Sequence, residues 1–258
     1  MDPATLIGIV LAIGALLTMM IMEGSSPLAI VLIPPLILVF GGTFGAAIAG
    51  SAMADVKKVG AWFKMALMPA KVPPVSDRIA TLVSLAEKAR KEGLLALEAQ
   101  VKDIDDPFLK RGLQMGIDGT DPEELREILE AELDGKRASD RQSAKFFNDM
   151  GGYAPTIGIF GTVMGLVHVL ENLSQPEELG HLIAGAFIAT LWGVLSANVV
   201  WLPIGSRLSR IGELEAQRME LVVEGVMAIQ AGSNPRVVAQ RLQSLLPAEE
   251  RETEQRAA

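Results

Sequence analysis

Charged residues are absent from four long stretches of the chain. Residues 3–22, 24–54, 150–170 and 182–206 contain no Asp, Glu, Lys or Arg. A helix needs about 20 apolar residues to cross the hydrocarbon core of a bilayer, and each stretch is about that long. Four such stretches exceed what the core of a soluble protein of this size would use. We therefore predict four transmembrane helices, over residues 3–22, 28–50, 153–171 and 182–205.

The polar segments between and after these stretches carry helical patterns. Apolar residues recur at helical spacing in two runs: Ile79, Leu82, Val83, Ala86 and Ala89, and Leu125, Ile128, Leu129 and Leu133. Three pairs combine a capping side chain with a proline at the first helical position: Asp106-Pro107, Asp121-Pro122 and Asn234-Pro235. The sequence therefore predicts an all-α membrane protein with a helical insert over residues 51–152 and a helical tail over residues 206–258.

The basic residues indicate how the chain is oriented in the membrane. Of the 23 Lys and Arg residues, 16 lie in the insert and 7 lie after residue 205. The two short hinges, residues 23–27 and 171–181, contain acids but no Lys or Arg. Basic residues are retained on the cytoplasmic side. We therefore expect a multi-pass protein of the cytoplasmic (inner) membrane, with the insert, the tail and both termini in the cytoplasm.

Composition narrows the chemistry that the chain can perform. The 258 residues include no cysteine, which excludes disulfides, thiolate metal sites and cysteine nucleophiles. The two histidines, His168 and His181, lack the set of further ligands that a metal site needs. No basic stripe suggests that the chain binds a nucleic acid. No phosphate-binding glycine loop or nucleophile elbow is present. We therefore expect no enzyme, no cofactor, no bound metal and no nucleic acid.

The apolar stretches carry hydroxyl, amide and small residues in place of charge. Their polar residues are Thr156, Thr162, Thr190, Ser196 and Asn198, and their small residues include Gly161, Gly165, Gly185 and Gly193. The default interpretation is that the polar side chains bond backbone carbonyls or join helices, while the glycines allow close approach. Pro155 and Pro203 each remove a backbone donor near the cytoplasmic end of a span, which predicts a bend or a wet vestibule there. If ions pass here, another chain must supply the charge.

Three stretches together resemble a known family. They are GYAPTIGIFGTVMGLVHVLENL, LIAGAFIATLWGVLSANVVWLPI and the charged ARKEGLLALE, which is residues 89–98. With two spans, a helical insert of about a hundred residues, two more spans and a tail, the whole chain resembles the flagellar motor stator subunit of the MotA/PomA type. That type belongs to the wider MotA/TolQ/ExbB ion-channel group.

The resemblance implies a function and assigns residues to it. Thr162 and Thr190 match threonines of the ion pathway, Pro155 and Pro203 match prolines of conformational coupling, and Arg90 and Glu98 match charged residues that contact the flagellar rotor switch protein. The family implies five copies of this subunit around two copies of a MotB/PomB-type single-span partner, which brings an essential aspartate and a peptidoglycan-binding domain. Passage of H⁺ or Na⁺ past that aspartate would drive rotation.

The ion and two rival functions are left open by the sequence. A threonine hydroxyl at position 162 can supply an oxygen ligand to a hard cation, which favours Na⁺ over H⁺. A TolQ/ExbB-type energy-transducing channel subunit is the nearest alternative, although that type has one span before its cytoplasmic region where this chain has two. A membrane scaffold that transports nothing would show no ion-dependent output.

Overall fold

The computed structural model describes residues 3–69 and 75–246, and within these ranges every regular element is a helix. The first half contains α1 (Pro3–Met22), η1 (Pro27–Ile30), α2 (Ile33–Leu36), η2 (Ile37–Gly41), α3 (Gly42–Ala49), α4 (Met53–Val56), α5 (Val59–Leu67), α6 (Val75–Glu92), η3 (Leu94–Leu97), α7 (Glu98–Lys102) and α8 (Pro107–Ile117). The second half contains α9 (Pro122–Glu171), α10 (Pro176–Ser196), η4 (Ala197–Trp201), α11 (Leu202–Gln230) and α12 (Pro235–Ser244). The prediction of an all-α chain is confirmed for the described residues.

Two units share the chain, and the long helices contribute to both. Unit 1 comprises residues 1–70 and 140–211, and unit 2 comprises residues 71–139 and 212–258. Helix α9 begins in unit 2 and continues into unit 1, and α11 begins in unit 1 and continues into unit 2. The end of the insert and the third apolar stretch therefore form one continuous helix. The last part of the predicted tail, residues 247–258, lies outside the described residues.

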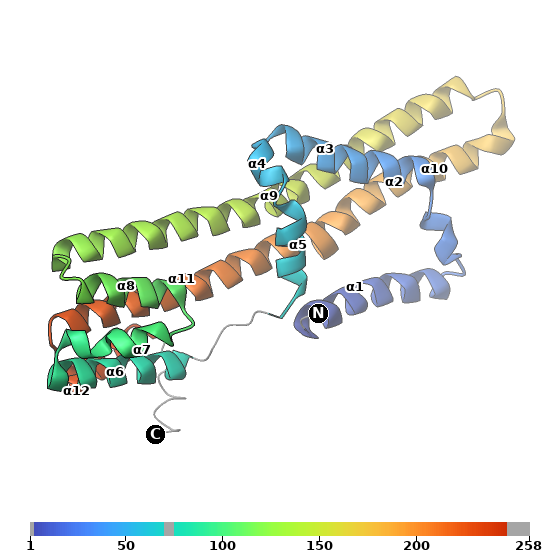
Figure 1. The fold of residues 1–258 in the computed structure, drawn as a ribbon. Helices are drawn as coiled ribbons and strands as arrows, with labels where there is room; N and C mark the ends of the chain where they lie inside the picture. The colour runs from blue at the N-terminus through green and yellow to red at the C-terminus, as the bar shows by residue number, and fades with distance from the viewer. Residues whose placement is uncertain (1–2, 70–74, 247–258) are drawn as a thin grey trace. The chain divides into compact units, whose positions relative to one another are not determined.

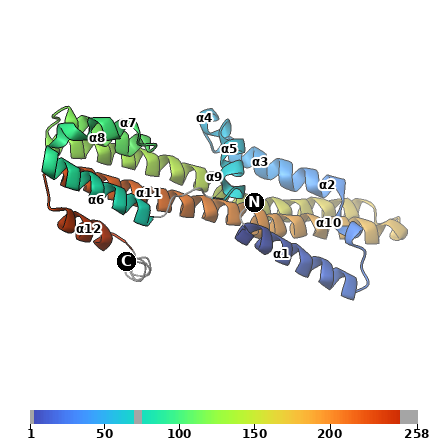
Figure 2. The ribbon, with the colours of Figure 1, turned by 60° about the horizontal axis from the view of Figure 1, so that its bottom comes forward.

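Unit 1 contains the apolar helices. Among the described residues, three helices are long and apolar enough to cross a membrane: Pro3–Met22, Pro122–Glu171 and Pro176–Gln230. The remaining predicted span, 28–50, corresponds to the shorter apolar helix Ile33–Ala49, which follows the separate turn η1. In unit 1, α2 and α3 lie alongside α9 and α10 (Figures 1 and 2).

Two segments of unit 1 are π-helical, η2 and η4. In η4 the backbone N–H of Leu202 donates to the carbonyl of Ala197, five residues earlier. Pro203 follows directly and has no N–H to donate, so a regular α-helical ladder would be broken at this point in any case. Single π turns inside α-helices are rare and occur frequently at functional sites.

Unit 1 has a hydrophobic core where α5, α9 and α11 meet. Its aromatic centre is Phe146 and Phe147 with Trp62, all buried. The rings of Phe146 and Phe147 meet edge-on with centroids 5.5 Å apart. Such aromatic pairs stabilise a core beyond the area that they bury. The part of α9 directly before the third apolar stretch therefore carries this core.

Unit 2 has its own hydrophobic core, formed by α6, η3, α7, α8, α12 and the parts of α9 and α11 that belong to it. The predicted stripe on α6 is confirmed, because Ile79, Leu82, Ala86 and Ala89 are buried. The stripe on α9 is confirmed at Leu125, Leu129 and Leu133, but Ile128 is 38% exposed. Ile128 is one residue before Leu129, so it lies about 100° around the helix and points out of the core.

Local capping signals determine where the helices of unit 2 begin. The carboxylate of Asp106 accepts from the backbone N–H groups of Phe108 and Leu109, at 2.8 and 3.2 Å. Asp121 and Asn234 accept in the same way at the starts of α9 and α12. All three proline-containing starts predicted from the sequence are confirmed.

Asp106 also binds the guanidinium of Arg78 on α6. Burial raises the pKa of the Asp106 carboxyl, but the hydrogen bonds from Arg78, Leu109 and Phe108 outweigh burial, so the pKa lies below its ordinary value. The same charge therefore caps α8 and fastens α8 to α6.

Ion pairs join α9 and α11 within unit 2. Lys136 lies 2.5 Å from Glu215, Arg126 lies 2.8 Å from Glu224, and Arg137 pairs with Glu220. Glu224 also receives Arg241 of α12 at 2.5 Å. Exposed ion pairs contribute about 0–1 kcal/mol each, so these pairs fix the register of the two helices more than they hold the unit together.

Candidate functional site

Small residues line the contact between α9 and α10. On α9 they are Ala154, Gly158, Gly161 and Gly165, and on α10 they are Ala186, Ala189 and Gly193. Spacings of three and four residues place each set on one helix face. We refer to this contact as the α9–α10 seam.

The seam brings the two backbones together. A Cβ added to Gly158 would lie 2.8 Å from the carbonyl oxygen of Ala189, and one added to Gly193 would lie 2.6 Å from the carbonyl oxygen of Ala154. A Cβ added to Gly165 would lie 2.6 Å from the Cβ of Ala186. Helices in membranes associate closely through small residues of this kind. Glycine is therefore required at these positions by the neighbouring helix.

Thr162 and Thr190 lie at the seam, one on each helix, and their hydroxyl groups are hydrogen-bonded to each other. The Thr162 hydroxyl also lies 3.0 Å from the carbonyl oxygen of Ala186 and 3.2 Å from that of Gly158. The Thr190 hydroxyl lies 3.3 Å from the carbonyl oxygen of Gly158. Both threonines are half-buried. The structure thus brings these two predicted residues together across 28 positions of sequence.

The other hydroxyl and amide side chains singled out from the sequence bond within their own helical segment. Thr156 donates to the carbonyl of Tyr153 at 2.8 Å, Ser196 to that of Gly193 at 3.3 Å, and Asn198 to that of Val194 at 2.8 Å. These contacts match the default interpretation given to them from the sequence. Thr162 and Thr190 differ because their hydroxyls reach a second helix.

The two prolines occupy different surroundings. Pro155 lies inside α9 against the seam, where a Cβ on Gly193 would come 3.3 Å from its Cα. Pro203 is exposed on the first turn of α11, next to the π turn η4. The expected irregularity is therefore visible at Pro203, whereas α9 continues through Pro155.

Arg90 and Glu98 belong to unit 2 and lie on either side of a turn. Arg90 is near the end of α6, and Glu98 begins α7. Gly93 joins them with φ of +86°, a left-handed conformation that glycine adopts without strain. Both charged side chains are exposed, and Lys102 lies 3.8 Å from Glu98. These two residues form a second candidate surface, on unit 2.

The exposed face of α6 carries one short ion pair. Lys91 donates to Glu87 at 2.6 Å, and this hydrogen bond lowers the pKa of the Glu87 carboxyl and raises that of the Lys91 ammonium. Arg90 has no hydrogen bond or ion pair with any residue in the described ranges. Its charge is therefore available to a partner, while that of Lys91 is already paired.

Sequence reasoning omitted one residue of the site and misplaced another. Gly158 is buried, and its carbonyl oxygen is within hydrogen-bonding distance of both threonine hydroxyls. Its position four residues before Thr162 is the signal that could have identified it. Gly185 was expected to pack closely, but only Leu32, at 3.8 Å, lies within 4 Å of the position of its missing Cβ. In the described part of the chain, no three His, Asp or Glu side chains gather as a metal site would require.

Two family models match the chain. The model described as the MotA/TolQ/ExbB proton channel family matches residues 100–221, which include the seam. The model described as the motility protein A N-terminal region matches residues 6–93.

Curated relatives match over nearly the full length. The chain is 37% identical over 251 residues to motility protein A of Bacillus subtilis (strain 168), covering 97% of this chain and 93% of the relative. It is 32% identical over 249 residues to chemotaxis protein PomA of Vibrio alginolyticus, covering 95% of this chain and 96% of that protein.

Solved structures show the same fold. A chain of the C. jejuni MotAB structure superposes with a TM-score of 0.91 at 30% identity, covering 96% of this chain and 97% of that one. A chain of the flagellar MotAB stator complex from Bacillus subtilis gives a TM-score of 0.89 at 36% identity, covering 97% of this chain and 98% of that one.

Proposed function

Because the chain belongs to the MotA/TolQ/ExbB proton channel family and is a flagellar stator subunit of the MotA type, we propose that it converts cation flow into torque on the flagellar rotor. It does so with a MotB/PomB-type single-span partner that carries the essential aspartate and a peptidoglycan-binding domain. Five copies of this chain surround two copies of the partner in the proposed assembly. Counting subunits in the co-purified complex tests that ratio.

We further propose that four helices cross the inner membrane, over residues 3–22, 28–50, 153–171 and 182–205. The shorter helix Ile33–Ala49 serves as the second span, since about 17 residues is the lower limit for crossing. The distribution of Lys and Arg supports a cytoplasmic insert, a cytoplasmic tail and cytoplasmic termini. Reporter fusions after residues 24, 120 and 246 would test this orientation.

The observation that carries the proposal is the pair of hydroxyls at the seam. Thr162 and Thr190 meet in a part of the chain that contains no Asp, Glu, Lys or Arg, since residues 150–170 and 182–206 carry none. An ion crossing a membrane needs polar groups along its path, and charged groups inside membranes mark such paths. This chain supplies oxygen atoms, and the partner's aspartate supplies the charge.

The hydrogen bonds at the seam explain how the threonines would assist an ion. A hydroxyl has one proton to donate and two lone pairs. When Thr190 donates to the carbonyl of Gly158, the single proton of Thr162 is donated to the Thr190 oxygen, and both lone pairs of the Thr162 oxygen stay free. Such an oxygen suits a hard cation such as Na⁺. The seam can therefore present the Thr162 hydroxyl as an acceptor.

The choice between Na⁺ and H⁺ is tested by swimming speed. We propose Na⁺ as the transported ion, because Thr162 adds a hydroxyl oxygen at the pathway. Speed measured against sodium concentration at fixed pH should rise and then saturate. A speed that does not respond to sodium would assign the motor to protons.

Pro155 and Pro203 are proposed to couple ion passage to movement of the helices. Pro203 lies beside the π turn η4, and Pro155 lies against Gly193 of the seam. A membrane potential of 100 mV supplies about 2.3 kcal/mol for each elementary charge that crosses it. That energy is of the size needed to move a helix between two packed arrangements, so each ion could advance the ring by one step.

Arg90 and Glu98 are proposed to contact the rotor switch protein. Both are exposed at the α6–η3–α7 turn, and Arg90 has no partner within residues 75–246. Reversing both charges, Arg90→Glu with Glu98→Lys, should leave flagella assembled but poorly rotating. The matched control reverses the charges of Glu87 and Lys91, which already pair with each other. Normal rotation in the first variant would refute the rotor contact.

The threonine pair has a separate test with an isosteric control. Thr162→Val removes the hydroxyl and keeps the shape, whereas Thr162→Ser keeps the hydroxyl. Torque should fall strongly in the valine variant and be largely retained in the serine variant. Equal torque in both variants would show that the hydroxyl has only a packing role.

A TolQ/ExbB-type channel subunit shares the family model over residues 100–221. The additional match of residues 6–93 to the motility protein A N-terminal model favours the stator function. The adjacent reading frame should encode a single-span protein with an intramembrane Asp and a peptidoglycan-binding domain.

A further inference from the structure

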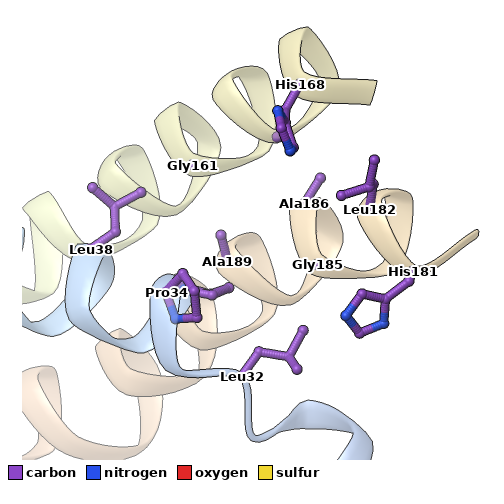
Figure 3. Close-up of a pocket in the computed structure, with 12 residues that line it drawn as sticks. Leu32, Pro34, Leu38, Gly161, His168, His181, Leu182, Gly185, Ala186 and Ala189 are labelled. Carbon is purple, nitrogen blue, oxygen red and sulfur yellow. The ribbon is translucent and has the colours of Figure 1, made fainter. Parts of the chain in front are cut away.

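A cavity of ≈ 420 Å³ lies in unit 1 between α2, α9 and α10, and small residues of the α9–α10 seam form part of its wall. Its walls are almost wholly apolar: Leu32, Pro34, Pro35 and Leu38 on one side, with Gly161, Gly165, Leu182, Gly185, Ala186 and Ala189 on the other. Figure 3 shows the α2 segment facing the two longer helices across this space. Volumes of about 300–1,000 Å³ with apolar walls are typical of ligand sites.

Two imidazoles occur at one end of the cavity. His168 on α9 and His181 on α10 lie at the same end in Figure 3, away from Leu38. They are the only histidines of the chain, and each has an acid nearby. Glu171 lies 3.6 Å from His168, and Glu178 is three residues before His181 in the sequence. The cavity therefore runs from an apolar interior to a polar end where charged residues resume.

An apolar space of this size inside a helix bundle does not remain empty without cost. Side chains that face a void lose dispersion contacts, and water gains nothing from entering a site with so few polar partners. In a membrane, the surrounding medium consists of hydrocarbon chains that are as apolar as leucine. An acyl chain can therefore fill the space without any desolvation cost.

A helix from a neighbouring copy does not fit the same space. A helix is at least about 10 Å across with a rise of 5.4 Å per turn, so one turn alone fills about 400 Å³. The whole cavity would accommodate a single turn, whereas a spanning helix needs five or six. A flexible chain, one methylene group wide, matches both the volume and the walls.

We propose that this cavity is a binding site for one acyl chain of a membrane phospholipid, in the leaflet next to the hinge between α9 and α10. The tail lies against Leu38, Gly185 and Ala189. The phosphate and ester oxygens accept hydrogen bonds from the ring N–H groups of His168 and His181, which gives the two histidines a function. The inference depends on the chain spanning a membrane and not on how torque is produced.

Gly185 offers a way to fill the cavity from the protein side. Only Leu32, at 3.8 Å, lies within 4 Å of the position where its Cβ would be, so a larger side chain enters the space without a clash. The matched control is Gly8→Leu on α1, because Gly8 is exposed and has no neighbour within 4 Å. Both variants add the same side chain to an apolar helix.

The experiment uses the full chain co-purified with its partner in vesicles that contain phosphatidylglycerol with a photoactivatable group in the acyl chain. After illumination, mass spectrometry should find label on peptides that contain residues 32–38 and 182–189, above the label on α1. Gly185→Leu should reduce that label at least about tenfold, because the leucine displaces several methylene groups of the lipid. Gly8→Leu should leave it unchanged.

Two further variants distinguish loss of lipid binding from failure of the complex to assemble. Gly185→Ala adds one methyl group and should reduce the label less than leucine while the complex elutes normally. His168→Leu with His181→Leu should reduce it severalfold by removing the headgroup contacts. Label that is equal in Gly185→Leu and Gly8→Leu would overturn the site. So would cross-links from these peptides to a second copy of the chain in place of lipid.

Discussion

Replacing Gly158 with alanine gives the sharpest test of the seam. The added Cβ would lie 2.8 Å from the carbonyl oxygen of Ala189, 3.1 Å from the Cα of Thr190 and 3.2 Å from the Cα of Gly193. All three atoms belong to the backbone of α10, so no side chain can rotate to make room. The two helices must separate by a few tenths of an ångström or more.

The magnitude follows from two opposing effects. Overpacking a tight contact costs about 1–3 kcal/mol. Alanine stabilises a helix relative to glycine by about 0.5–1 kcal/mol. The net result should be destabilisation by about 0–2.5 kcal/mol, the difference of those two ranges. Because the nearest Cα is that of Thr190, the separation should also weaken the bond between Thr162 and Thr190.

Gly152→Ala is the control, since it makes the same substitution on the same helix. Gly152 is exposed and has no neighbour within 4 Å of its missing Cβ, so only the gain in helix propensity should remain. Thermal unfolding of the purified complex should therefore shift down for Gly158→Ala and stay level or shift up for Gly152→Ala. Equal stability of the two variants would refute the close backbone contact at the seam.

Three further changes probe other parts of the fold. Arg78→Gln should reduce the acid sensitivity of unfolding. The pKa of Asp106 is lowered in the folded chain, so its carboxylate stabilises the fold above the unfolded pKa of about 3.9, and this stabilisation is lost as pH falls below that value. Melting curves from pH 7 to pH 3 that overlay those of the wild type would contradict this. Leu82→Ala should destabilise unit 2 by about 2–5 kcal/mol in denaturant titrations, since Leu82 is fully buried. Leu95 is 73% exposed, so Leu95→Ala should change the free energy of unfolding by no more than about 0.5 kcal/mol. Trp192→Phe removes the 2.7 Å hydrogen bond from the indole to the carbonyl of Ile30 and should cost about 0.5–1.5 kcal/mol by thermal unfolding, with Trp201→Phe as the comparison.

Features determined by neighbouring residues were predicted well from the sequence. The starts of α8, α9 and α12 depend on an Asx side chain and a proline within three positions, and all three are found. The charge-free stretches depend on composition alone, and three of the four are long apolar helices in the described residues.

Features that depend on distant segments were predicted less well. Residue type placed Gly185 with the close-packing glycines, but the face of α10 that meets α9 could be decided only by the partner helix. Gly158 was omitted because its importance comes from Thr190, 32 residues later. Family resemblance assigned both Thr162 and Thr190 to the ion pathway, but their hydrogen bond to each other was not predicted, since no spacing rule relates two residues on different helices. The π turns leave no periodic signal that could be read from one sequence.

The π turn η4 has a consequence for insertions and deletions. It holds one residue more than an α-helix of the same rise would need, so the extra residue is taken up within the turn. The face that carries Thr190 before the turn and the face that carries Leu208 after it therefore keep the relation that they would have in an α-helix one residue shorter. Loss of one residue from Ala197–Trp201 should convert the turn to α-helix with little rotation of either face. Loss of one residue from the regular α-helix on either side is not taken up in this way and would rotate one face by about 100°.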